Sequence, residues 1–205
     1  FSLFVVIKLS MFPFHFWFLN ICYRFPNFVL FLSSSFHKVP VFLIIILFNP
    51  VFNLSFMMVS TILTVVLSGF MMLFSIDFRS VIVCSSVGNN SWFFLSSLLD
   101  LFSFILFFSI YCFFLFLLVS ELSIFTKPLI TKISRGRLSL FYYIIFLRGL
   151  PPFPVFFAKM FVLFSLILKF DMRVYLSLFI FSSCLMLVGY VYSVSKYFIH
   201  IYSSQ

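Results

Sequence analysis

The chain has 205 residues, of which 64% are hydrophobic and 8% are charged, and only four of them are acidic. Its mean hydropathy of +1.29 leaves too little polar surface for a water-soluble domain, so the composition predicts an all-α, polytopic membrane protein. The net charge of +9 comes from lysines and arginines that lie mostly between apolar stretches. That placement is typical of loop cations in membrane proteins and argues against a nucleic-acid partner.

The first two apolar segments each contain a lysine followed by a proline. Residues 1–18 carry Lys8 and Pro13, and because they begin within an apolar stretch we expect the chain to start in mid-helix, with upstream helices missing. Residues 28–48 form a second span, which the sequence HKVP at 37–40 interrupts. Proline removes a backbone donor and clashes with the preceding turn, so a break is predicted in both segments.

Three uninterrupted helices are predicted after the turn signal NPVFN, over residues 54–76, 80–98 and 101–124. The second of them contains the polar stretch SSVGNNSW at 85–92. We interpret this stretch as a helix-packing or water-lined face, with a functional role as the alternative.

The C-terminal third contains a broken segment that forms a pair with residues 1–18. Residues 138–168 are mostly apolar, but RGLPPFP at 148–154 divides them into halves that are each shorter than the roughly 20 residues a crossing needs. We therefore expect one discontinuous helix, followed by a last span over 174–196. The predicted fold is a single transmembrane domain, 1–205, with about seven transmembrane helices, two of them discontinuous.

Three lysines lie inside apolar segments, where each charge costs about 2.5–3.5 kcal/mol. A single lysine near a helix end can extend to the membrane surface. Each of these three, however, has prolines close by, and a broken helix offers free carbonyls and room for water. A lysine ammonium removed from bulk water is suited to proton exchange. We therefore predict proton transfer through Lys8, Lys38 and Lys159.

Supporting roles are predicted for two histidines and three prolines. His15 and His37 are candidate proton-exchanging neighbours of the first two lysines, although a packed histidine bonded to a carbonyl is an equal alternative. The prolines would open the helices; they are Pro13, Pro151 and Pro152. The sequence contains no nucleotide-binding loop, no catalytic triad pattern and no metal-ligand spacing among its four cysteines, so we expect neither a cofactor nor a metal in this chain.

Four motifs in order carry a resemblance to a known family. They are KLSMFPFHFW at 8–17, HKVP at 37–40, RSVIVCSSVGNNSW at 79–92 and RGLPPFPVFFAK at 148–159. Their order, spacing and content resemble the subunit 2 family of mitochondrial NADH:ubiquinone oxidoreductase, respiratory complex I. The resemblance covers nearly the whole chain.

The resemblance implies an antiporter-like subunit with inverted repeats in the mitochondrial inner membrane, whose membrane lysines pass protons while other subunits oxidise NADH and reduce ubiquinone. It implies that Lys8 and Lys159 are the lysines of the two broken helices and that Lys38 links two half-channels. FMN and iron–sulfur clusters would be carried by other subunits. The implied partners are other membrane-arm subunits and the lipid bilayer, and a separate chain could supply the missing N-terminal helices.

The chain departs from the family pattern at several positions. His37 replaces a glutamine, Asn89 a histidine, and Ser10 and Ser91 replace glycines. The family also has an intramembrane glutamate on a helix that would precede residue 1. Two alternatives therefore stay open: another antiporter-like complex I subunit or a cation/proton antiporter, and a shortened structural subunit that no longer pumps.

Overall fold

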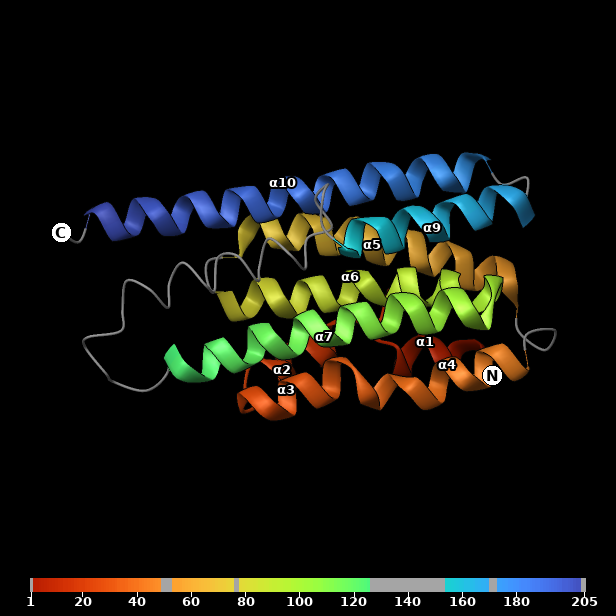
Figure 1. The fold of residues 1–205 in the computed structure, drawn as a ribbon, viewed down its shortest axis with the longest axis horizontal. Coiled ribbons are helices and arrows are strands. Elements are labelled where there is room, and N and C mark those ends of the chain that lie inside the picture. The colour runs from red at the N-terminus through yellow and green to blue at the C-terminus, as the bar shows by residue number, and fades with distance from the viewer. Residues whose placement is uncertain (1, 49–52, 76–77, 126–153, 170–172, 204–205) are drawn as a thin grey trace.

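The structure is a computed structural model of the chain, and it describes residues 2–48, 53–75, 78–125, 154–169 and 173–203. These residues form helices joined by short connections, and no strand occurs among them. The helices run side by side in an elongated bundle (Figure 1). The predicted all-α class is confirmed.

The N-terminal part consists of short helices, because both of its apolar segments are interrupted. The first segment is divided at residues 9–15 and the second at residues 35–38, as the prolines predicted. The elements are α1 (Ser2–Lys8), α2 (Phe16–Cys22), α3 (Asn27–Ser34), the 3₁₀ turn η1 (Phe36–Lys38) and α4 (Val39–Leu47).

The second interruption has a local cause in a run of serines. The hydroxyl of Ser34 donates to the carbonyl of Leu30 at 2.7 Å, and that of Ser35 donates to the carbonyl of Phe31 at 2.6 Å. Such back-bonding bends helices, and Pro40 then allows only a new helix start. Lys38 lies at the joint between the two halves.

Five longer helices form the rest of the described bundle, and their bounds agree with the predicted spans to within a few residues. There are two exceptions: α10 extends further than predicted, and only the second half of the 138–168 segment is described. The five helices are α5 (Leu54–Phe74), α6 (Phe78–Leu99), α7 (Leu101–Phe125), α9 (Pro154–Lys169) and α10 (Arg173–Ser203). The first half of the predicted discontinuous helix, including its RGLPPF stretch, lies outside the described residues.

The helix α6 occupies the centre of the bundle. It packs against α5, α7, α4 and α9, and every residue from Ser80 to Ser97 is buried. Within the described ranges, three helical segments are long and apolar enough to cross a membrane: Asn27–Leu47, which comprises α3, η1 and α4, Ser55–Phe74 and Leu101–Ser120. The central helix is less apolar because its side chains face other helices and not lipid.

Two contacts fix neighbouring helices at close range. A Cβ atom on Gly189 of α10 would lie 2.9 Å from Cβ of Met72 on α5, so these helices approach where glycine leaves space. The guanidinium of Arg79, at the start of α6, donates to the carbonyls of Tyr23 (3.1 Å) and Phe25 (2.6 Å) and to Oδ1 of Asn27 (2.7 Å). Arg79 thereby holds the α2–α3 connection against the beginning of α6.

Candidate functional site

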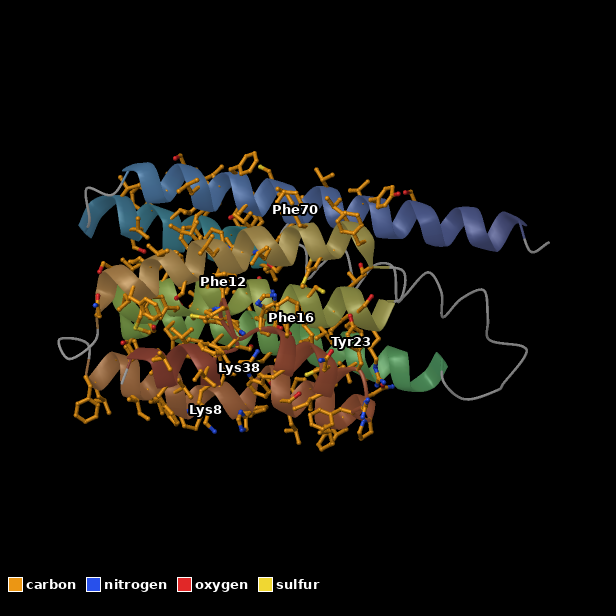
Figure 2. All side chains as sticks on the ribbon, turned by 180° about the vertical axis from the view of Figure 1, so that it is seen from behind. Lys8, Phe12, Phe16, Tyr23, Lys38 and Phe70 are labelled. Atoms are coloured by element: carbon orange, nitrogen blue, oxygen red, sulfur yellow. The ribbon has the colours of Figure 1, made fainter. Side chains whose placement is uncertain are left out.

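Lys38 is the most deeply buried charged side chain in the described part of the protein, with 2% of its surface exposed. Its Nζ donates a hydrogen bond of 2.9 Å to Oδ1 of Asn90 and lies 4.4 Å from the ring centroid of Phe18. Figure 2 shows Lys38 on the side of the bundle formed by the N-terminal helices.

Asn90 of α6 connects Lys38 to the first helix interruption. Its Nδ2 donates to the carbonyl of Leu9 at 2.7 Å and lies 3.3 Å from Oγ of Ser10. The carbonyl of Leu9 would receive the amide of residue 13 in a continuous helix, but that residue is Pro13, which has no N–H. The Asn90 amide therefore satisfies a carbonyl that the proline leaves free.

The backbone at the first interruption has two further features. Ser10 has a φ of 54°, in the left-handed region that favours glycine, and its hydroxyl donates to the carbonyl of Leu9 at 2.6 Å. Trp17 of α2 donates from Nε1 to the carbonyl of Ile7 at 3.1 Å, across the interruption. Both halves of the first segment are thus held by side-chain bonds in place of helical ones.

Lys159 is the second buried lysine and lies on the opposite side of α6. It is 8% exposed, and its Nζ lies 5.4 Å from the ring centroid of Trp92. Between Asn90 and Trp92, the hydroxyl of Ser91 is hydrogen-bonded to that of Thr64 on α5. Three consecutive residues of α6 therefore contact Lys38, α5 and Lys159.

Lys8 does not join this cluster. The sequence placed it inside an apolar segment, but the structure exposes its side chain at the surface of the described bundle, with Nζ 5.7 Å from the ring centroid of Phe4. Phe4 is itself 58% exposed, whereas Val5, Val6 and Leu9 are buried. Lys8 and Phe4 are four residues apart and so share the outer face of α1. Figure 2 labels Lys8 among the same N-terminal helices.

The two histidines differ in their surroundings. His15 is 3% exposed, and neither of its ring nitrogens has a hydrogen-bond partner among the described residues. Its ring lies 4.0 Å from that of Phe16. His37 is exposed, although it directly precedes Lys38. Of the predicted helix-opening prolines, Pro13 acts through its missing donor, while Pro151 and Pro152 lie outside the described residues.

The arrangement brings together groups that can exchange a proton. It contains the buried amine of Lys38, the amide of Asn90 that accepts a hydrogen bond from it, the imidazole of His15 whose ring nitrogens have no hydrogen-bond partner among the described residues, and an interrupted backbone on the N-terminal side of the bundle. In the ranges that the structure describes, no group of three or more histidine, cysteine or acidic side chains is placed to hold a metal ion. Asn90 was missed in the sequence; the available signal was its position in the polar stretch 85–92 of a membrane helix.

Comparison with known proteins identifies the family. The family model described as "NADH:quinone oxidoreductase/Mrp antiporter, TM" matches residues 1–189. The chain belongs to this antiporter family. It is also similar to NADH-ubiquinone oxidoreductase chain 2 of Lumbricus terrestris, with 25% identity over 195 residues that cover 91% of this chain.

The antiporter-family assignment confirms the resemblance that the four motifs predicted. The match covers 58% of the earthworm protein, so the chain spans a little over half of that relative's length. Together with the apolar helices, membership of the family places this chain in a membrane. The outer face of α1 is exposed in the chain considered without any partner subunit.

Proposed function

We propose that the chain is a membrane-arm subunit of respiratory complex I that takes part in proton translocation coupled to electron transfer from NADH to ubiquinone. The proposal is supported by the family match over residues 1–189 and by the similarity to a protein named as chain 2 of that enzyme. The corresponding location is the mitochondrial inner membrane.

The observation that carries the proposal is the position of Lys38. A buried ammonium inside a membrane bundle is costly, and such residues occur where a proton or ion path needs them. Lys38 lies at a helix interruption, is 2% exposed and has an amide as its hydrogen-bond partner in place of a carboxylate. With a neutral partner, the amine can lose its proton without leaving an unpaired buried anion.

Lys159 and Lys8 would be the further members of the path. Lys159 contacts Trp92, two residues along α6 from the partner of Lys38, so one helix joins both buried lysines. Lys8 is exposed in the chain alone, which makes the outer face of α1 the place where a carboxylate from outside these residues would meet it. His15, with two unbonded ring nitrogens among the described residues, would exchange protons through water.

The electron-transfer chemistry would belong to other subunits. Flavin and iron–sulfur clusters carry hydride and electron transfer, and we assign none of them to this chain. Its contribution would be to move protons within the bilayer, beside other membrane-arm subunits and lipid.

Isolation of the chain with its native partners tests this proposal. The chain is captured by an antibody against its C-terminal residues from gently solubilised membranes, and the eluate is assayed for rotenone-sensitive NADH:quinone reductase activity and for flavin. We expect activity and flavin to co-elute with the chain, and peptides of other complex I subunits to accompany it. Capture without NADH oxidation would contradict the complex I assignment and favour an independent cation/proton antiporter, the other activity in the family description.

A further inference from the structure

We propose that Asn90 is a positioning residue that couples Lys38 to the interruption of the first membrane helix, so that a change at Lys38 is transmitted to residues 9–15. The functional consequence rests on the proposed function, in which Lys38 carries protons. The structural coupling itself does not, and it is tested separately below.

The geometry places one side chain between two defects of the membrane helices. Oδ1 of Asn90 lies 2.9 Å from Nζ of Lys38, at the joint of α3 and α4. Nδ2 of the same amide lies 2.7 Å from the carbonyl of Leu9, which Pro13 deprives of its helical donor. Asn90 is fully buried, so water does not compete for either bond in this arrangement.

The chemistry of the two partners fixes the orientation of the amide. Lys38 has only donors, so it must face the carbonyl oxygen, and the Leu9 carbonyl is an acceptor, so it must face the NH₂ group. A residue with only acceptors, such as aspartate, would bind Lys38 but would present its oxygens to the Leu9 carbonyl. An apolar residue would satisfy neither partner. Asparagine therefore meets both requirements at once.

The coupling follows from this shared amide. When Lys38 loses its proton, its bond to the Asn90 oxygen is no longer charge-assisted and weakens, and when Lys38 moves away the bond is lost; the Asn90 side chain is then freer to turn. The Leu9 carbonyl then loses its donor and is left with the hydroxyl of Ser10, at 2.6 Å, in a segment with few helical bonds. The first interruption would loosen in response to an event at Lys38, which lies more than 20 positions away in the chain.

Hydrogen–deuterium exchange of the full chain, read by mass spectrometry on peptides covering residues 9–15, tests the coupling. Asn90→Leu removes both bonds. We expect exchange in residues 9–15 to rise about three- to tenfold, which corresponds to the loss of one buried hydrogen bond, the one from Asn90 to the Leu9 carbonyl. Lys38→Met leaves Asn90 intact but removes its ammonium partner, and we expect a smaller rise, about twofold or more, in the same segment. Ser97→Ala is the matched control, because Ser97 is buried on α6 and its hydroxyl donates to the carbonyl of Phe94 on the same helix.

Wild-type exchange at 9–15 in the Lys38→Met protein would overturn the proposal, since Asn90 would then only cap the Leu9 carbonyl. If Asn90→Leu does not accumulate in the membrane, Asn90→Asp replaces it: the carboxylate keeps Lys38 but not Leu9, and exchange should rise at 9–15 alone. Unchanged exchange in that variant would equally refute the coupling. Failure of the complex I assignment would leave these results untouched, because they require no NADH-linked activity.

Discussion

Lys38→Met should leave the stability of the bundle nearly unchanged, although it replaces one of the largest fully buried side chains. Methionine has a similar length and volume, so it fills the same space without a cavity. The substitution removes the cost of holding an ammonium in an apolar surrounding, about 2.5–3.5 kcal/mol on insertion scales.

The opposing losses have a similar size. The charge-assisted hydrogen bond to Asn90, 2.9 Å long, contributes about 1.5–3 kcal/mol. The contact with the ring of Phe18, at 4.4 Å, contributes up to about 2 kcal/mol. Because these opposing contributions nearly cancel, the free energy of unfolding should change by no more than about 2 kcal/mol.

Thermal unfolding of the solubilised chain, followed by circular dichroism, measures this difference. A change of about 2 kcal/mol corresponds to a shift in Tm of about 4–8 °C for a chain of this size. Phe42→Ala is the positive control: Phe42 is fully buried in α4, in the same membrane segment, and its loss should cost about 3–5 kcal/mol. A Lys38→Met protein as unstable as that control would refute the reasoning, because Lys38 would then hold the fold and its burial would not indicate proton transfer.

Three further substitutions test single features of the fold. Ser10→Gly relieves the strain of the left-handed backbone at φ 54° but loses the hydrogen bond to Leu9; each effect is about 1 kcal/mol, so Tm should hardly change. Ser10→Ala should lower Tm, because the strain stays and the hydrogen bond is lost. Arg79→Met removes three hydrogen bonds to the α2–α3 connection, and limited digestion with trypsin should cut after Arg24 several times faster than in the wild type; an unchanged rate would show that the connection holds without Arg79. Gly189→Ala places a Cβ atom 2.9 Å from that of Met72 and should cost about 1–3 kcal/mol in thermal unfolding, a result that a wild-type Tm would contradict.

The helix breaks could be predicted from the sequence because their causes are local. Pro13 removes a donor wherever it lies in a helix, and Pro40 can only begin one, so the positions of both interruptions follow from the chain itself. The same applies to the long spans, since a run of apolar residues near 20 in length is sufficient to indicate a crossing.

The direction of each lysine could not be predicted in the same way. Lys8 and Lys38 both precede a proline in an apolar segment, yet Lys8 is exposed whereas Lys38 is buried, with 2% of its surface exposed. The face that a short helix turns inward is decided by its neighbours: α1 buries Val5 and Val6 and so turns Lys8 outward. The orientation of a short helix relative to its neighbours cannot be predicted from composition alone.

The partner of Lys38 was hidden for a related reason. Asn90 is 52 positions away in the sequence, and only the packing of α6 in the centre of the bundle brings the two together. Asparagines in a membrane helix indicate a buried polar partner, but not which one. The sequence comparison distinguished Asn89, which replaces a family histidine, whereas it is the neighbouring Asn90 that binds Lys38.

The number of protons translocated per NADH oxidised, measured in sealed membrane vesicles that carry the Lys38→Met chain, tests the central claim most directly. Lysine at this position is proposed to carry protons, and methionine cannot. The account predicts that NADH oxidation persists in uncoupled vesicles while the proton-to-NADH ratio falls below that of the wild type. A wild-type ratio would contradict the account and leave the chain a structural subunit of its complex.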